Sequence, residues 1–135
     1  MKTKIYLSLL IICLMLSSCA TTYRFPISSV APAADGTAKF TKDNNNNYIV
    51  NVKVKYLSNA DRLIPAKKLY VVWIKTDNDE VKNIGQLMSD NKNNASLTGT
   101  TSSRPVQIFV TAEDAGDVNW PSNQELFRIQ DILLK

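Results

Sequence analysis

The chain has 135 residues, of which 44% are hydrophobic and 21% charged, and it contains two cysteines and no histidine. This length accommodates one ordinary domain. The absence of histidine removes the commonest general base, the commonest metal ligand and the usual pH-sensitive side chain. The composition therefore weighs against most hydrolase, zinc and redox functions and favours binding over catalysis.

The N-terminal region has the organisation of a bacterial lipoprotein signal. Lys2 and Lys4 precede an apolar run over residues 5–16, which has the length of a signal-peptide hydrophobic region and is shorter than the about 20 residues of a spanning helix. The run ends in Leu16-Ser17-Ser18-Cys19, which resembles the lipobox that precedes lipid attachment. We expect residues 1–18 to be a cleaved signal peptide. The alternatives are a plain secretory signal and a short anchor helix with an incidental cysteine.

Cys19 is the predicted lipidation site. In the lipoprotein class that this motif resembles, the mature cysteine carries a thioether-linked diacylglycerol and usually an N-acyl chain such as palmitate, and more than one acyl chain holds a protein stably on a membrane. Ala20 follows the cysteine. An aspartate at this position would resemble an inner-membrane retention signal, and an acidic cluster here would resemble a surface-export signal, but neither is present. We therefore expect anchoring in the outer membrane, with the domain facing the periplasm.

Removal of the signal changes both the charge and the thiol count. The whole chain has 16 Lys and Arg against 12 Asp and Glu, a net charge of +4, and loss of Lys2 and Lys4 lowers this to +2. Such a weak excess gives no support to nucleic-acid binding, which needs a clustered basic face. Cys13 leaves with the signal and Cys19 is occupied by lipid. No thiol then remains for a disulfide, a zinc site or a nucleophile.

The mature chain divides into a linker and a domain. Residues 19–35 combine prolines, small residues and serines without a sustained period, which is typical of a tether. We expect the lipidated cysteine and tether to cover residues 19–35, with residues 23–27 pairing at a sheet edge. The folded domain is predicted over residues 36–135.

Strand signals dominate this domain. Apolar residues occupy every second position over residues 48–56 and 106–112, and this alternation predicts half-buried strands. Residues 69–74 form a continuous apolar run, which predicts a central strand buried on both faces. Weaker strand signals cover residues 37–42, 80–88, 95–100 and 126–129.

Turn signals rich in Asn and Asp separate these segments, because such side chains bond their own backbone and tolerate left-handed conformations. They lie at residues 43–47, 58–61, 76–79, 90–94 and 113–122. About seven short strands in about 100 residues indicate an all-β fold, an antiparallel immunoglobulin-like β-sandwich. The single helical signal is a turn near residues 61–68.

The domain contains four landmarks in this order: Tyr70-Val71-Val72-Trp73-Ile74, Ile84-Gly85-Gln86-Leu87, Val110-Thr111-Ala112-Glu113 and Pro121-Ser122. Together they resemble the extracytoplasmic C-terminal domain of anti-sigma-K factors. That family has a Tyr-x-x-Trp strand, a glycine after the next hairpin, a strand ending in glutamate and a downstream proline. The resemblance covers roughly residues 36–130 and implies a sandwich used for extracytoplasmic sensing or interaction. The family's sigma-binding segment and transmembrane helix have no counterpart in this sequence, so we expect no sigma-factor binding.

Aromatic residues give two hypotheses. Tyr70 and Trp73 are three positions apart and point to opposite faces of a strand, so we expect Trp73 to be the core tryptophan and Tyr70 to cover the other side. Trp120, beside Pro121 in a predicted loop, is interpreted as a plug over one end of the sandwich. The alternative is that Trp120 contacts a ligand.

Acidic residues gather in two places. Those of the hairpin at 77–80 lack the spacing of a calcium-binding loop and are interpreted as a solvated turn. Glu113, Asp114 and Asp117 form a denser acidic loop around Gly116, which is a candidate contact for calcium or for a partner. Lys53 and Lys55 lie between apolar strand positions and are expected on the solvated face.

The sequence as a whole predicts a lipid-anchored cell-envelope β-sandwich that acts as a non-catalytic protein-interaction or sensing module. Another envelope protein is the expected partner, and the candidate contact residues are Glu113, Asp114, Asp117 and Trp120. The alternative is an accessory lipoprotein that binds a carbohydrate or calcium with the 113–122 loop. We expect no enzymatic activity, no catalytic or metal-ligating residue, and no cofactor besides the covalent lipid on Cys19.

Overall fold

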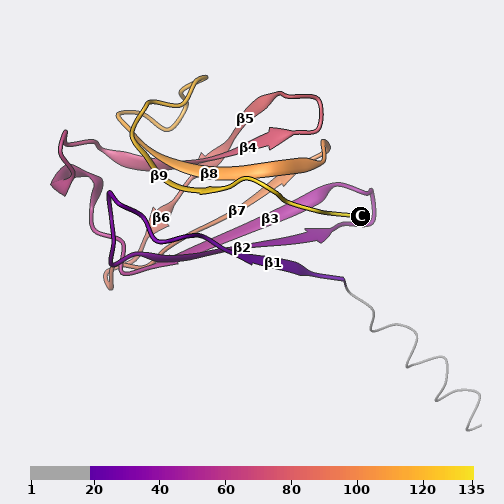
Figure 1. Cartoon of the computed structure of the whole chain (residues 1–135), viewed down its shortest axis with the longest axis horizontal. Coiled ribbons are helices and arrows are strands. Elements are labelled where there is room, and N and C mark those ends of the chain that lie inside the picture. The colour runs from indigo at the N-terminus through magenta and orange to yellow at the C-terminus, as the bar shows by residue number, and fades with distance from the viewer. Residues whose placement is uncertain (1–18) are drawn as a thin grey trace, which may run out of the picture.

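The computed structural model describes residues 19–135, and the predicted signal peptide over residues 1–18 lies outside the described residues. Two antiparallel sheets stack face to face (Figure 1), with strand orders β1-β2-β3-β7-β6 and β5-β4-β8-β9. The predicted all-β antiparallel sandwich is therefore confirmed. The strands are β1 (Thr21–Arg24), β2 (Asp35–Lys42), β3 (Tyr48–Lys55), β4 (Leu69–Thr76), β5 (Val81–Gln86), β6 (Met88–Ser89), β7 (Ala95–Thr101), β8 (Pro105–Glu113) and β9 (Glu125–Ile129).

All seven predicted strands are present, and the structure adds two. The signal over residues 80–88 is divided between β5 and β6, which belong to different sheets. The chain crosses from one sheet to the other at Leu87, which is 3% exposed and donates its backbone N–H to the Tyr70 carbonyl. A 3-10 turn, η2 (Ala60–Arg62), lies where the weak helical signal begins.

The segment predicted to be a tether is instead part of the sandwich, so the domain boundary at residue 36 is wrong. β1 pairs with β2, with Thr21 opposite Phe40, so the expected pairing at a sheet edge is present but covers residues 21–24 and not 23–27. Phe25 packs on Phe127 of the other sheet with ring centroids 5.1 Å apart. Because this segment contributes a strand and a core aromatic residue, the folded domain starts at Thr21.

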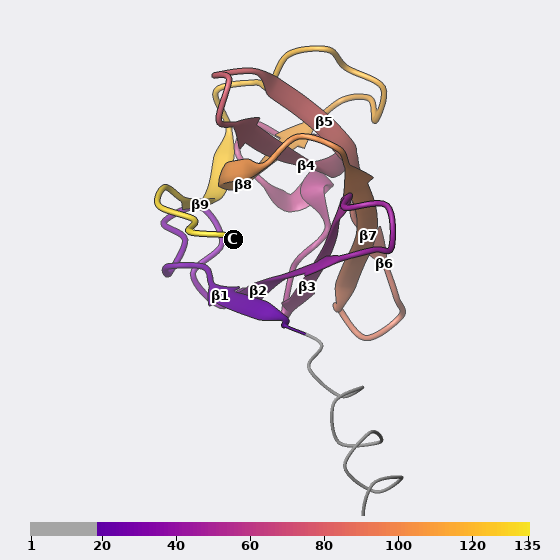
Figure 2. The same ribbon diagram turned by 90° about the vertical axis from the view of Figure 1, so that its right-hand side faces the viewer.

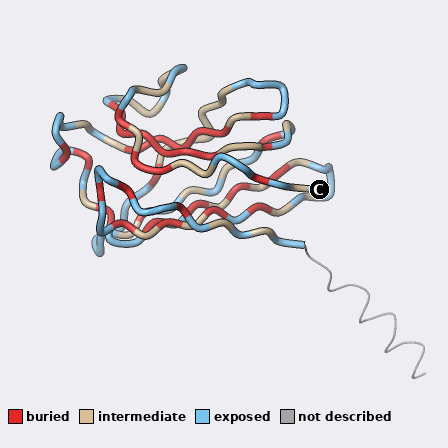
Figure 3. Tube along the Cα trace, in the orientation of Figure 1, coloured by how far each residue is buried: buried red, intermediate tan, exposed pale blue. Residues whose placement is uncertain are grey.

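The main core lies between the two sheets, and alternate residues over 36–40 of β2 and 48–54 of β3 are buried there (Figure 3). Tyr70, Val72 and Ile74 of β4 face this core. Trp73 faces the opposite side, so the predicted assignment of Tyr70 and Trp73 is reversed. Both faces of β4 are apolar, and alternation within the strand therefore cannot tell which face meets the second sheet. Lys53 and Lys55 are exposed, as predicted.

A second, smaller apolar cluster covers the outer face of the four-stranded sheet. Trp73 is 0% exposed and stacks on Phe109 of β8, with centroids 6.3 Å apart and an interplanar angle of 12°. Val71 completes this cluster, and Val118 packs on it from the connection between β8 and β9. Figure 2 shows this connection outside the four-stranded sheet. The central strand is thus buried on both faces, as its continuous apolar run predicts.

Two of the predicted turns, at residues 43–47 and 90–94, use the same hydrogen bonds. In each turn the aspartate at the first position accepts backbone N–H groups from the third and fifth positions, at 2.8 and 2.9 Å in the first turn and 2.7 and 3.0 Å in the second. The fourth positions, Asn46 and Asn93, have φ of 62° and 59°. Asn tolerates this left-handed conformation better than most residues.

The connections gather at the two ends of the sandwich (Figure 1). We call one the Cys19 end; it holds Cys19, the turn at 43–47, the β4–β5 hairpin and residues 132–135. We call the other the distal end; it holds the connections at 25–34, 56–68, 90–94 and 114–124. Over residues 19–135 no helix has the length and apolar character needed to cross a membrane.

Candidate functional site

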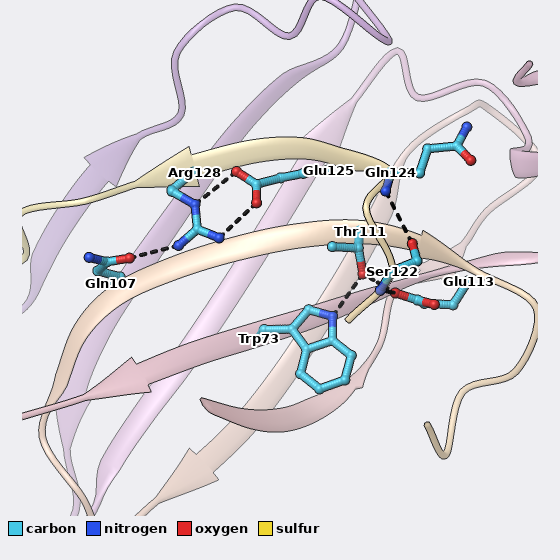
Figure 4. A network of polar contacts seen from close by, with 8 residues as sticks. All are labelled: Trp73, Gln107, Thr111, Glu113, Ser122, Gln124, Glu125 and Arg128. Atoms are coloured by element: carbon cyan, nitrogen blue, oxygen red, sulfur yellow. Dashed lines mark hydrogen bonds and ion pairs between the residues drawn. The ribbon is translucent and has the colours of Figure 1, made fainter. Parts of the chain in front are cut away.

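The predicted contact residues lie at the distal end, in and beside the connection between β8 and β9. Glu113, the last residue of β8, is 5% exposed and belongs to the interior. Its Oε1 accepts hydrogen bonds from the Thr111 hydroxyl at 2.5 Å and from the Ser122 backbone N–H at 2.7 Å (Figure 4). Its carboxylate therefore holds the loop closed, and the structure does not offer it to a ligand.

Thr111 links this carboxylate to the buried tryptophan. The Trp73 indole N–H donates to Thr111 Oγ1 at 2.8 Å, and the same hydroxyl donates onward to Glu113. A hydroxyl has one proton and two acceptor positions, so it can serve both neighbours. A buried indole N–H needs such a partner. The polar chain therefore joins the outer apolar cluster to the start of the loop.

Ser122 closes the other end of the loop. Its hydroxyl donates to the Ala112 carbonyl at 2.8 Å and accepts the Gln124 backbone N–H at 3.2 Å. The Gln124 side chain donates to the Pro65 carbonyl at 3.0 Å, which ties the loop to the segment after η2. Residues 113 and 122 are consequently held together at the base of a short, braced loop.

Asn83 of β5 supports the middle of the loop. Its side-chain amide donates to the carbonyls of Gly116 and Val118 at 2.9 and 3.0 Å. An irregularity in the pairing of β4 with β5 places Asn83 opposite Trp73 and Gly85 opposite Val72. Such bulges re-aim side chains, and here Asn83 lies on the outer face, beneath the loop.

The remaining acidic candidates do not converge. Asp114 forms a 3.0 Å ion pair with Lys67, and Asp117 is exposed. Among residues 19–135 no three His, Cys, Asp or Glu side chains lie close enough together to hold a metal ion. With Glu113 turned inward, the loop presents only separate acidic side chains at its surface.

Trp120 is the most prominent side chain of the loop, because 78% of its surface is exposed. The interpretation of Trp120 as a plug over the end of the sandwich is therefore wrong. Trp73 occupies the sheltered position instead, beneath Val118 of the same loop. The braced loop thus presents one indole to solvent while it covers another.

Exposed apolar side chains are concentrated at the distal end. Seven large hydrophobic residues of the described chain are exposed, and six of them lie in distal connections or next to them. A cavity of about 450 Å³ opens at the same end beside Tyr70 and Met88. The Tyr70 hydroxyl donates to the Ser58 carbonyl at 2.7 Å, and burial raises the pKa of this phenol. The six distal residues are Ile27, Val30, Tyr56, Ile64, Met88 and Trp120.

Polar contacts also close the outer face of β8 and β9. The Arg128 guanidinium lies over the Phe109 ring, 3.9 Å from its centroid, and donates twice to Glu125 at 2.8 and 2.7 Å. A third bond from Arg128 reaches the Gln107 side chain at 2.7 Å (Figure 4). Because Arg128, Glu125 and Gln107 bond to one another, their polar groups are already paired within the domain. The tip of the 114–121 loop is therefore the better candidate for a binding surface.

Sequence reasoning missed Thr111, Asn83 and Arg128. Thr111 lies among apolar residues of a strand, a place where a polar residue signals an internal partner. Asn83 carries no such signal, because its contacts with the loop are 33 and 35 residues away in the chain. Cys19, the remaining predicted site, is exposed and lies two residues before β1.

Comparison with known proteins gives no further guide to function, since no protein-family model, curated protein or solved structure matches this chain. The candidate site therefore depends on the geometry alone. That geometry consists of a braced distal loop with an exposed tryptophan, and an exposed cysteine at the opposite end of the sandwich.

Proposed function

We propose that this protein is a lipid-anchored module of the cell envelope that binds another envelope protein with its distal end and has no catalytic role. The observation that carries the proposal is the separation of the two ends. Cys19 lies at one end, and six of the seven exposed large hydrophobic residues of the described chain lie at the other. An anchor at one end leaves the distal surface free to meet a partner.

The anchor is supported by the sequence around Cys19. The order of a basic region, a short apolar run and Leu16-Ser17-Ser18-Cys19 is that of a lipoprotein signal. Cys19 is exposed, so attached lipid meets no obstruction from the folded domain. With Ala20 as the following residue, the outer membrane facing the periplasm is the proposed location.

The distal loop has the properties of a binding surface. Trp and Tyr are enriched among the residues that dominate binding. Trp120 is carried by a loop that Glu113, Ser122 and Asn83 already hold in place. Binding through a preorganised loop loses less conformational entropy than binding through a mobile one.

The strand order supports an immunoglobulin-like assignment. In such domains strands A, B, E and D form one sheet and C, F and G the other. If β2 is taken as strand A, β4 as strand C and β5 as an added C′, the two sheets become A-B-E-D and C′-C-F-G. Trp73 departs from the antibody pattern, in which the strand C tryptophan faces the core. The likeness to the anti-sigma-K extracytoplasmic domain belongs to this proposal and supports a sensing or interaction role.

Cys19→Ser tests the anchor. We expect the variant to accumulate as unprocessed precursor and to lose stable membrane attachment, while wild-type protein is processed and fractionates with membranes. Mass spectrometry of the mature N-terminus provides the direct readout of acylation. Normal processing and membrane retention of the Cys19→Ser protein would contradict the anchor.

Site-specific photo-crosslinking in cells tests the distal surface. A photoreactive residue in place of Trp120 or Ile64 should capture the same envelope protein, because both positions lie at the distal end. The matched control is Thr98, an exposed residue on the outer face of the five-stranded sheet. Trp120→Ala should then weaken binding of the purified partner. Equal capture from position 98 would argue against a distal site.

Exposure of Trp120 also favours one alternative, an accessory lipoprotein that binds a carbohydrate by stacking a sugar on the indole. This version predicts binding on a glycan array that is lost in Trp120→Ala. The related calcium version predicts a calcium-dependent rise in melting temperature that is lost in Asp114→Ala. Either result, without a crosslinked protein partner, would replace the proposed function.

A further inference from the structure

We propose that the Cys19 end of the sandwich lies directly on the lipid bilayer, with Leu133 inserted into it and Lys42 and Lys135 among the headgroups. The occupant of this surface is the bilayer itself. The inference rests on the proposed lipidation of Cys19. It adds an orientation of the domain on the membrane and names the residues that set it.

The first argument is the short connection between the lipid and the folded domain. Cys19 is followed by Ala20 and then by β1, whose first residue, Thr21, pairs with Phe40. Two residues span at most about 7 Å even when fully extended. A lipid on Cys19 therefore keeps this end of the sandwich within contact distance of the headgroups, which the predicted tether over residues 19–35 would not have done.

The second argument is the placement of Leu133. This side chain is 83% exposed, although the segment that carries it is held against the sandwich. The Leu133 backbone N–H donates to the Tyr23 hydroxyl at 2.9 Å, and the preceding residue, Ile132, is buried and donates its N–H to the Val106 carbonyl at 3.0 Å. The fold thus fixes an apolar side chain outward beside the anchor. It is the single exposed large hydrophobic residue at this end of the described chain.

The third argument is the chemistry of the hollow beside Cys19. A cavity of about 500 Å³ is lined by Cys19 and Phe40 together with Lys42, Tyr48 and Lys135. The Lys42 ammonium lies 4.9 Å from the Tyr48 ring centroid. Aromatic rings beside lysines are suited to the membrane interface, where apolar parts enter the acyl boundary and cations meet phosphates. Asp43, the neighbouring carboxylate, already accepts hydrogen bonds within its own turn.

A competing orientation places the five-stranded sheet flat on the membrane. The outer face of that sheet carries the exposed cations Arg24, Lys39, Lys53 and Lys55. These charges attract anionic lipid, but the anchor and Leu133 are both at the end of the sandwich. The end-on orientation therefore satisfies the anchor and the apolar contact together.

The test uses the lipidated full-length mature protein in vesicles of phosphatidylethanolamine and phosphatidylglycerol. Because Cys13 lies within the predicted signal and Cys19 carries the lipid, a newly introduced cysteine is the one reactive thiol. Leu133→Cys reports on the Cys19 end, and Thr98→Cys reports on the sheet face. Ile64→Cys, at a residue that is 97% exposed, reports on the distal end. All three positions are exposed, so substitution there should leave the fold intact.

Each variant receives an environment-sensitive fluorophore. We expect the label at position 133 to shift to shorter wavelength on vesicle binding, to be quenched by spin-labelled lipid, and to lose most of its quenching by aqueous iodide. Labels at positions 98 and 64 should behave as they do without vesicles. Membrane contact at position 98, or an aqueous environment at all three positions in protein that floats with the vesicles, would overturn the orientation.

The anchor is checked separately in the same preparations. Wild-type protein should float with vesicles and should take up no thiol label. Labelling of wild-type Cys19, or failure to float, would contradict the lipid anchor and the orientation together. Lys42→Glu combined with Lys135→Glu should lessen lipid quenching at position 133, whereas Lys53→Glu with Lys55→Glu on the sheet face should not. An equal effect of the two pairs would contradict the role given to Lys42 and Lys135.

Discussion

The buried carboxylate of Glu113 accepts a hydrogen bond at 2.7 Å from the backbone N–H of Ser122, nine residues later in the chain. The same oxygen accepts the hydroxyl of Thr111, which in turn receives the indole N–H of Trp73. This network lets the loop over residues 114–121 cover Trp73. The exposed Trp120 is therefore held by a loop whose base is closed by an interior charge.

Glu113→Ala should lower the free energy of unfolding by about 1–3 kcal/mol, because it leaves the Ser122 N–H and the Thr111 hydroxyl without their acceptor. Urea denaturation followed by circular dichroism measures the change. Asp117→Ala is the matched control, since an exposed loop carboxylate should change stability by no more than about 0.5 kcal/mol. Equal stability of the two variants would mean that Glu113 does not brace the loop.

Asn83→Ala should loosen the loop over Trp73, because it removes the donor to the carbonyls of Gly116 and Val118. In a Trp120→Phe background Trp73 is the single tryptophan, so its fluorescence reports on the cover directly. We expect acrylamide quenching of Trp73 to increase clearly over that of Trp120→Phe alone. Asn51→Ala, which removes a surface bond to Thr98, is the control. If acrylamide quenching of Trp73 does not increase in Asn83→Ala, the Asn83 side chain does not hold the loop over Trp73.

The two aspartate turns should contribute to acid sensitivity. Hydrogen bonds lower the pKa of Asp43, chiefly through the Asn47 side chain, and that of Asp90, chiefly through the Asn94 backbone, below 3.8 in the folded state. Their stabilisation is therefore present above the ordinary pKa and is lost as the pH falls through the lowered values. Asp43→Asn with Asp90→Asn should reduce the loss of stability below about pH 4, as measured by thermal melts. Ser96→Ala, at an exposed position outside both turns, should leave this loss unchanged.

Gly85→Ala should destabilise the fold by about 1–3 kcal/mol, because the residue has a φ of +133° and a Cβ there would meet Leu97 Cδ1 at 3.0 Å. Gly116→Ala is the matched control. A Cβ at Gly116 would meet the end of the flexible Gln86 side chain, also at 3.0 Å. Chemical denaturation of both variants checks the difference. If Gly116→Ala lowers the free energy of unfolding as much as Gly85→Ala does, the positive φ of Gly85 is not the cause of the destabilisation.

The strands and most of the turns follow from local sequence patterns, because both depend on neighbouring residues. Alternation over residues 48–56 and 106–112 identifies β3 and β8, since side chains of a strand point to opposite faces with a period of two. The turns at 43–47 and 90–94 are equally local, because each aspartate bonds its own turn. The proposed lipobox at Cys19 is a local pattern of the same kind.

The packing of the two sheets determines which strand faces meet and which polar side chains are buried. Trp73 and Tyr70 belong to a strand that is apolar on both sides, so the choice of core face depended on where the second sheet packs. Glu113 is buried because Ser122 and Thr111 supply its hydrogen bonds. Trp120 is exposed because Val118 is the residue of this loop that packs on the cluster around Trp73. The segment after Ala20 became β1 because the edge of β2 was available to it. These outcomes depend on contacts between residues that are distant in the chain, and such contacts cannot be predicted from a local sequence pattern.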